Sequence, residues 1–334
     1  MSASVVLVHL GPRLPRYVEV HLQRLQRQFP GRVSLISDSR IPTGMEKLRI
    51  HPQDVLKPED PLWGPLGLES YPLRPRLWLS SFQRLALVGA FAQATGSPTV
   101  HLESDVVVLW PEAIEALALL PREIRFPIID AEVGIASTLL IPSREAAREF
   151  LSELRSISGE PDIGTEMECL GNLAMRSTNF SPLDVIEVSS LDRSSSAQLA
   201  RFDGAAIGVH LLGVDPVHTR GFVRVRSGIT RDRIDVAKGQ WNLGRGSLEG
   251  NAIDLTWDAE RIATLHANSK EPSLFRPDGR GLQRRLRRSL EGRQPILRMS
   301  APALFELSAL RVRSASSAAR SMFSGHSKDE KVGQ

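Results

Sequence analysis

Two carboxylates, Glu103 and Asp105, stand in an otherwise apolar stretch of the chain, residues 98–110. The Val, Leu and Thr residues around them predict a buried strand, in which ionised carboxylates are unstable unless they are paired. Because side chains two residues apart on a strand point to the same face, the two carboxylates are expected to lie together. At a strand end such a pair can hold a divalent cation, and the cation can hold a diphosphate. The alternative is a pair that simply faces water at a sheet edge.

Five further side chains of chemical interest stand in other segments of the chain. His266 follows an apolar run and Lys270 comes four residues later, so both could face one site; a structural histidine is the alternative for His266. Glu166 lies near the start of a predicted helix, where a carboxylate either complements the helix dipole or serves as a general base. Asp215 precedes a proline, which is also an ordinary turn signal. Arg84 lies on an amphipathic helix, either facing water or contacting an anionic ligand.

The beginning of the chain predicts a scaffold that could position these groups. Residues 4–10 are typical of a buried strand, residues 15–29 of an amphipathic helix, and residues 33–38 of a second strand. Such a β-α-β unit has parallel strands and a right-handed crossover. A helix over residues 77–94 then leads to a strand over residues 100–109, which carries the two carboxylates.

The rest of the sequence continues the alternation of strands and helices. Residues 40–75 are rich in proline and charge and are expected to be irregular. The predicted helices cover residues 114–120, 144–155 and 162–175, and the predicted strands cover 132–141, 185–188, 244–251 and 256–266. The pattern predicts an α/β fold with helices on both faces of the sheet.

Composition narrows the class of protein. The chain has 334 residues, 41% of them hydrophobic and 24% charged, as in ordinary globular proteins. Its single cysteine, Cys169, excludes an internal disulfide framework and a cysteine-based zinc site. Neither a signal peptide nor an apolar run long enough to span a membrane is evident, so a cytoplasmic location is expected.

Charge is distributed unevenly along the chain. Residues 276–334 hold 13 Lys and Arg against 5 Asp and Glu, about +8, which leaves about −4 for residues 1–275. This distribution argues against a nucleic-acid-binding protein, whose basic residues cover a folded face. Within the basic part, Leu282, Leu286 and Leu290 recur among arginines and predict a short amphipathic helix. It would either lie peripherally on the anionic inner face of a membrane or pack on the body; residues 314–334 are expected to be disordered.

The order of these elements resembles the nucleotide half of a GT-A glycosyltransferase. The features in common are the β-α-β start, the helix that carries Trp78, Phe82 and Arg84, and the strand His-Leu-Glu-Ser-Asp-Val-Val-Val, which carries an E-x-D variant of the D-x-D motif. The resemblance implies a mixed, mostly parallel central sheet flanked by helices. It further implies a Rossmann-like nucleotide half over residues 1–110, an acceptor half over 111–275, and a basic helical and partly disordered extension over 276–334.

The resemblance also implies the ligands and their contacts on the donor side. A UDP- or GDP-sugar would be the donor, and Mn²⁺ or Mg²⁺ would stabilise its diphosphate leaving group. Asp105 would bind the metal directly, while Glu103 would contact the ribose or a metal-bound water. The segment Thr-Leu-His-Ala-Asn-Ser-Lys resembles a closing motif of such enzymes, in which His266 completes the metal shell and Lys270 reaches the diphosphate. Arg84 is a further candidate contact of the diphosphate.

On the acceptor side, the resemblance points to a saccharide or a lipid-linked saccharide. Glu166 matches the helix-start carboxylate that serves as a general base, with Glu168 as second choice. The glycine-punctuated segment 202–221 resembles the acceptor segment of bacterial sugar transferases, and its Asp203 and Asp215 supply polar groups.

Two other functions remain open at this point. A sugar-phosphate nucleotidyltransferase would share the β-α-β start and the metal carboxylates. However, the segment Leu-Gly-Pro-Arg-Leu-Pro-Arg after the first strand has one glycine and two prolines, a poor phosphate-binding loop. A non-catalytic binding protein of the same fold is the second alternative.

Overall fold

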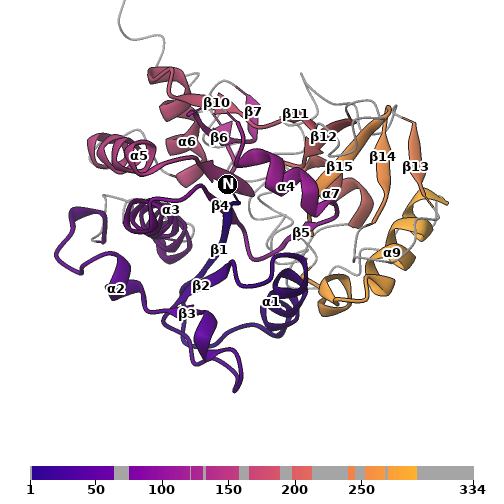
Figure 1. Cartoon of the computed structure of the whole chain (residues 1–334), viewed down its shortest axis with the longest axis horizontal. Helices are drawn as coiled ribbons and strands as arrows, with labels where there is room; N and C mark the ends of the chain where they lie inside the picture. Colours follow the sequence, from indigo (N-terminus) through magenta and orange to yellow (C-terminus); the bar gives the residue numbers. More distant parts are fainter. Residues whose placement is uncertain are drawn as a thin grey trace, which may run out of the picture.

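The computed structural model shows a mixed α/β protein (Figure 1). The structure describes residues 2–63, 75–120, 122–130, 133–157, 165–188, 198–212, 240–244, 253–267 and 270–291. Residues 213–221, which include Asp215, and residues 292–334 lie outside these ranges. The acceptor role expected of Asp215 and the disorder expected for residues 314–334 therefore concern residues that the structure does not describe. Within the described residues, no helix combines the length and apolar character needed to cross a membrane.

A seven-stranded sheet forms the centre of the molecule, in the order β10-β6-β9-β4-β1-β2-β3. Its strands are β1 (Ser4–His9), β2 (Val33–Ser37), β3 (Arg49–Ile50), β4 (Thr99–Leu102), β6 (Ile124–Phe126), β9 (Thr138–Ile141) and β10 (Phe180–Pro182). The strands β3, β2, β1 and β4 are parallel, β9 runs against its neighbours β4 and β6, and β10 is parallel to β6. The prediction of a mostly parallel sheet is thereby confirmed.

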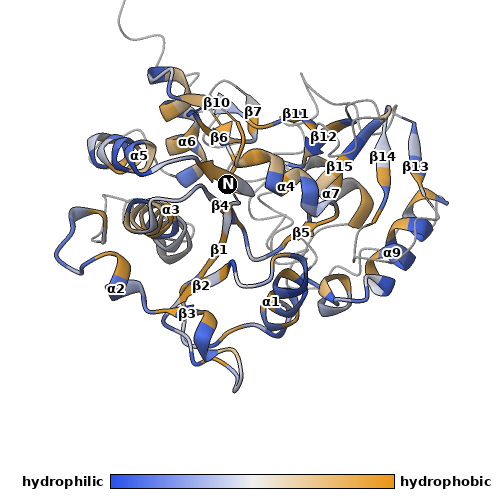
Figure 2. Cartoon of the chain, viewed as in Figure 1, coloured by the Kyte–Doolittle hydropathy of each residue, from blue (hydrophilic) through white to orange (hydrophobic). Residues whose placement is uncertain are grey.

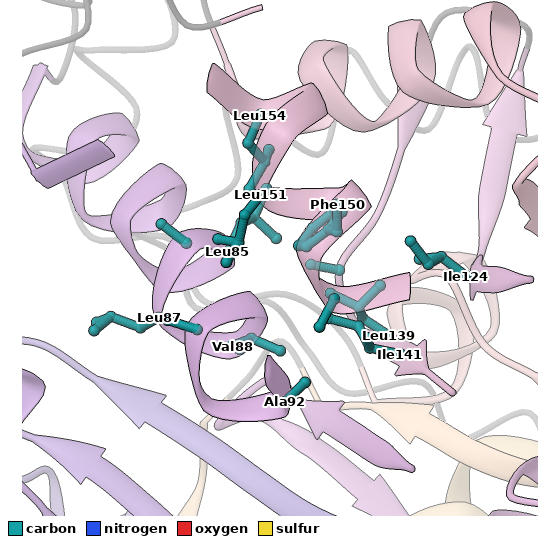
Figure 3. Close-up of a cluster of buried hydrophobic side chains, with 14 of the residues drawn as sticks. Leu85, Leu87, Val88, Ala92, Ile124, Leu139, Ile141, Phe150, Leu151 and Leu154 are labelled. Carbon is teal, nitrogen blue, oxygen red and sulfur yellow. The ribbon is translucent and has the colours of Figure 1, made fainter. Parts of the chain in front are cut away.

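Helices cover both faces of this sheet. Alternate residues of β1 point to opposite faces, so each face presents apolar side chains that a layer of helices buries. Val6 and Val8 belong to the core beneath α3 (Pro75–Thr95), α5 (Arg144–Ile157) and α6 (Glu166–Arg176). Figure 3 shows part of this core, where Leu85 of α3 lies beside Leu151 of α5. Val5 and Leu7 belong to the opposite core, which α1 (Arg16–Gln28) and α4 (Pro111–Leu117) cover.

A second sheet packs beside the first, in the order β11-β12-β15-β14-β13, with β5 paired to β15. Its strands are β5 (Val106–Val108), β11 (Val185–Val188), β12 (Gln198–Phe202), β13 (Trp241–Leu243), β14 (Leu255–Trp257) and β15 (Glu260–His266). It is accompanied by α7 (Ala206–Leu212), the 3₁₀ turn η4 (Pro272–Phe275) and α9 (Arg280–Leu290). Leu282 and Leu286 of α9 are fully buried beside Val107 and Phe275. The apolar face of the basic helix therefore packs on the body of the protein, which was one of the two alternatives for this helix.

The strand predicted over residues 100–109 is the main error of the sequence-based fold. It is two strands, β4 and β5, which belong to different sheets. Residues 103–105 form the turn between them, closed by a hydrogen bond from the Val106 N–H to the Glu103 carbonyl (3.0 Å). Glu103 and Asp105 are therefore brought together by a turn, and not by strand alternation.

Smaller differences concern short elements. The region 40–75, expected to be irregular, contains β3, α2 (Pro52–Val55) and the 3₁₀ turns η1 (Glu46–Leu48) and η2 (Pro61–Trp63). The strand predicted over 132–141 is split into β8 (Val133–Gly134), which pairs with β7 (Ile128–Asp130), and β9. Residues 256–266 form a hairpin, because Asp258 and Ala259 adopt left-handed φ values of 47° and 67° that turn the chain.

Candidate functional site

The carboxyl ends of β1 and β4 mark the place where the order of the parallel strands reverses. From β1 the chain continues to β2 on one side, and it later returns to pair β4 on the other side. In open α/β sheets a crevice forms at such a point, and ligands bind there. His9 ends β1, and Glu103 follows directly after β4. The E-x-D turn consequently lies at the position where this sheet favours a binding site.

The turn that carries the carboxylates is fixed by α1 and by the segment before β9. The Tyr17 hydroxyl lies 3.1 Å from Ser104 Oγ, and His21 Nδ1 donates to the Ser104 carbonyl at 3.1 Å. The Glu103 N–H donates to the carbonyl of Ser137. Only 9% of Glu103 and 8% of Asp105 is exposed. The turn thus presents both carboxylates in a protected setting and not at a free sheet edge.

His266, at the end of β15, meets both carboxylates. Its Nε2 lies 3.2 Å from Asp105 Oδ1 and 3.5 Å from Glu103 Oε2. One ligand atom from each of the three residues lies within 4.8 Å of the others, a spacing that could hold a metal ion. Two carboxylates and one imidazole suit a divalent first-row ion. We refer to Glu103, Asp105 and His266 below as the triad.

Lys270 approaches the triad from the opposite side of Asp105. Its Nζ lies 3.5 Å from Asp105 Oδ2. Its backbone has a left-handed φ of 51°, which residues other than glycine rarely adopt. The Lys270 N–H donates a hydrogen bond to the carbonyl of Ala267, the residue that follows β15 (2.9 Å). Lys270 thus places a cation beside the triad, and His266 and Lys270 face one site, which their spacing of four residues had left possible.

The backbone of His266 is held by Asp203, which precedes α7, and lies against Gly208 of α7. The Asp203 carboxylate accepts hydrogen bonds from the N–H groups of Ala205, Ile207 and Gly208 and from that of His266 itself (3.0 Å). A Cβ atom on Gly208 would lie 1.9 Å from the His266 carbonyl oxygen, so only glycine permits this approach. Asp203, expected among the polar groups of the acceptor segment, therefore serves together with Gly208 to position His266.

Arg84 joins the triad to Glu166. Its Nη2 lies 2.9 Å from Glu103 Oε1 and 3.4 Å from Glu166 Oε1. Burial lowers the pKa of Arg84, but Glu103 and Glu166 outweigh that effect and raise it. Only 16% of the Arg84 side chain is exposed, and its guanidinium lies between two carboxylates. The alternative of an arginine that faces water is therefore wrong.

Glu166 is the first residue of α6, where Thr165 caps the helix by accepting a hydrogen bond from the Glu168 N–H (3.1 Å). Burial raises the pKa of Glu166 to about 7, against the opposing effect of Arg84. Its Oε2 is buried and accepts no hydrogen bond from the residues that the structure describes. A carboxyl group with a pKa near neutrality and one uncommitted oxygen is suited to accept a proton.

Charge within the triad is strongly coupled. Burial alone would raise the pKa of Asp105, but His266 and Lys270 hold it well below its usual range. Burial alone would lower the pKa of His266, but Asp105 and Glu103 raise it to about 9. Without a metal, His266 and Asp105 therefore form an imidazolium–carboxylate ion pair. A metal ion that binds the imidazole of His266 would have to displace the proton of that ring.

Six of the seven side chains singled out from the sequence thus form one connected cluster: Arg84, Glu103, Asp105, Glu166, His266 and Lys270. The seventh, Asp215, lies outside the described residues. Sequence reasoning missed Tyr17 and His21, which hold the turn through Ser104. Their spacing of four residues on α1 places them on one helix face and is the signal that could have indicated a shared contact.

Comparison with known proteins does not identify a family for this chain. No protein-family model matches the sequence, and a search of curated proteins finds no similar chain.

Proposed function

We propose that this chain transfers a sugar from a UDP- or GDP-sugar to a saccharide or lipid-linked saccharide acceptor, with the general architecture of a GT-A glycosyltransferase. The observation that carries the proposal is the position of the triad. Two carboxylates and a histidine converge at the carboxyl end of β4, beside the point where the strand order reverses. This combination suits a nucleotide whose diphosphate is bound through a divalent ion.

On the donor side, the triad residues would hold Mn²⁺ or Mg²⁺, with Asp105 as the most direct ligand. A bound ion of this kind stabilises, as a Lewis acid, the negative charge that develops on a departing diphosphate. Lys270 would contact the diphosphate, since its ammonium group already lies 3.5 Å from Asp105. Arg84 would orient Glu103 through their ion pair. The nucleotide would occupy the crevice beside β1.

On the acceptor side, Glu166 would remove the proton from the attacking hydroxyl. Its raised pKa of about 7 matches the requirements of a base near neutral pH. Because a base opposite the leaving group supports a single displacement, this role predicts inversion of the anomeric configuration. Transfer should accordingly increase about tenfold per pH unit below pH 7 and level off above it.

The test is a panel of UDP- and GDP-sugars incubated with the full chain, with and without Mn²⁺, while release of the nucleoside diphosphate is measured. The variant Asp105→Asn keeps the size of the side chain but loses its charge, and should lower the rate by a factor on the order of 10² to 10³. Asp54→Asn, an exposed carboxylate of α2, is the matched control and should retain the full rate.

A second readout does not depend on turnover. Mn²⁺ together with UDP or GDP should raise the midpoint of thermal unfolding of the parent chain and leave that of Asp105→Asn unchanged. Equal rates for the parent and Asp105→Asn would disprove the assigned metal site. Release of pyrophosphate from a nucleoside triphosphate, with no reaction of any nucleotide sugar, would instead favour a nucleotidyltransferase.

A further inference from the structure

The outer face of α9 carries a strip of arginines that the fold does not use. Leu282 and Leu286 point into the core and are fully buried. The residues on the opposite side of the helix, at spacings of three, four and eight, are Arg280, Arg284, Arg287 and Arg288, and all four are exposed. We call these four residues the arginine strip. Figure 2 shows the strongly hydrophilic colour of α9 at the edge of the molecule.

Nothing in the described part of the chain neutralises the arginine strip. No salt bridge joins these four side chains to a carboxylate of the described residues. Arg285, which lies between the two faces, differs from them because it donates to the Leu212 carbonyl of α7 at 3.3 Å. The other side of α9 therefore anchors the helix, and among the described residues no carboxylate forms a salt bridge with the arginine strip, so the strip can bind an external anion.

We infer that the arginine strip binds the anionic surface of a membrane, with α9 lying flat on the headgroups. The leucines of α9 belong to the core together with Val107 and Phe275, so they are not available to enter the acyl region. Attachment must then be electrostatic, in contrast to an amphipathic helix that inserts its apolar face. Residues 1–275 carry about −4, so an anionic surface repels the rest of the body and orients the strip toward itself.

The shape of α9 favours a surface over a nucleic-acid groove. A helix that reads the major groove must protrude, because the groove is about 8.5 Å deep. One side of α9 is instead packed on α7, β13 and η4, which leaves only a strip exposed. A strip of positive charge on a helix that does not protrude suits a flat layer of phosphate headgroups.

The arginine strip is also connected to the candidate site. The ring of Phe275, at the end of η4, lies 5.3 Å from that of Tyr17 and 5.2 Å from that of His21, the two residues that hold Ser104. A membrane bound by α9 would thus lie on the same structural unit that supports the triad. The inference itself does not depend on the proposed sugar transfer, since membrane attachment is measured without any substrate.

The test is co-sedimentation of the full chain with vesicles of phosphatidylcholine containing phosphatidylglycerol, and with vesicles of phosphatidylcholine alone. Binding is expected only to the anionic vesicles, and it should weaken strongly as salt is raised. The double variant R284Q/R287Q should bind about 25-fold more weakly, since each arginine near an anionic surface contributes about fivefold. R284K/R287K keeps both charges and should bind within about twofold of the parent chain.

The matched control is R144Q/R148Q on α5. These two exposed arginines line a groove of about 550 Å³ and lie on the far side of the molecule from α9 (Figure 1). Their replacement removes the same charge and should leave vesicle binding unchanged. Thermal unfolding of each variant verifies that it is folded.

Three results would overturn the inference. The first is equal binding to anionic and neutral vesicles, and the second is undiminished binding by folded R284Q/R287Q. The third is binding to duplex DNA, at matched phosphate concentration, that is tighter than binding to the anionic vesicles.

Discussion

Arg84 links two carboxylates whose functions would differ. A single nitrogen of its guanidinium contacts both Glu103 and Glu166, at 2.9 and 3.4 Å. The Arg84 cation favours the ionised state of Glu166, yet burial still raises the pKa of Glu166 to about 7. The balance leaves Glu103 as a metal-side carboxylate and Glu166 as a group that exchanges its proton near neutral pH.

The raised pKa of Glu166 predicts a pH dependence of stability. The pKa is raised from an ordinary value of 4.5 to about 7, so the folded chain keeps a proton that the unfolded chain has lost between these values. The contribution is fully present below pH 4.5 and is lost as pH rises through 7, by roughly 3 kcal/mol. Glu166→Gln stays neutral, so its free energy of unfolding should lack this decline.

Urea unfolding of both chains at intervals from pH 4.5 to 8 measures the difference. Glu59→Gln, an exposed position, is the control and should follow the parent chain. A parallel decline in Glu166→Gln and the parent chain would contradict the assigned titration.

The sequence revealed the residues of the site by type and not by their contacts. Charged side chains within apolar runs, such as Glu103 and Asp105, stand out because burial of an unpaired charge is unfavourable. The sequence left two alternatives for Arg84, since an arginine on an amphipathic helix looks solvated until its partners, Glu103 after β4 and Glu166 of α6, are placed. Tyr17 and His21 were missed for the same reason: their shared partner, Ser104, belongs to a distant segment.

At the scale of elements, the contact between α7 and β15 determines where His266 stands. Gly208→Ala would place a Cβ atom 1.9 Å from the His266 carbonyl oxygen, so α7 must move away or β15 must shift. We expect a loss of about 3 kcal/mol in the free energy of unfolding, together with loss of stabilisation by Mn²⁺. Both effects are measured by thermal unfolding with and without the ion.

Gly204→Ala provides the matched control in the same segment. A Cβ atom there would lie 3.2 Å from Pro127 Cβ, which a small displacement relieves. The expected cost is less than about 1 kcal/mol, with the response to Mn²⁺ retained. A Gly208→Ala chain as stable and as responsive as Gly204→Ala would show that the approach of α7 does not fix His266.

Local pattern predicted most elements but not the division between sheets. The strand–helix–strand start was found within a residue or two, because apolar periodicity is strong there. The break at residues 103–105 was missed because apolar residues flank the turn on both sides. Strand pairing determines this break, because β4 pairs with β1, whereas β5 pairs with β15, a strand much later in the chain. No short window of sequence contains that partner.

For the whole molecule, α9 completes the core of the second sheet. A chain ending at Phe275 loses the two fully buried leucines, Leu282 and Leu286, whose burial contributes roughly 4 kcal/mol together. The midpoint of thermal unfolding should fall by about 10 °C. A chain ending at Glu291 keeps every described core residue and should unfold within about 2 °C of the full chain.

Differential scanning calorimetry of the three lengths measures this difference. Equal midpoints for the chains ending at Phe275 and Glu291 would mean that α9 adds nothing to the core, and would also remove the structural reason for its leucines to face inward.

The turn at residues 103–105 has a consequence for how the protein matures. It lies on the seam between two sheets, and His266 reaches it only from β15, near the end of the described chain. During synthesis the carboxylates emerge long before their histidine, so the triad cannot assemble until the second sheet has formed and docked. An ion with affinity for the triad would then stabilise the fully folded protein and not a partly folded intermediate that lacks the second sheet. The triad would thus assemble in the last step of folding.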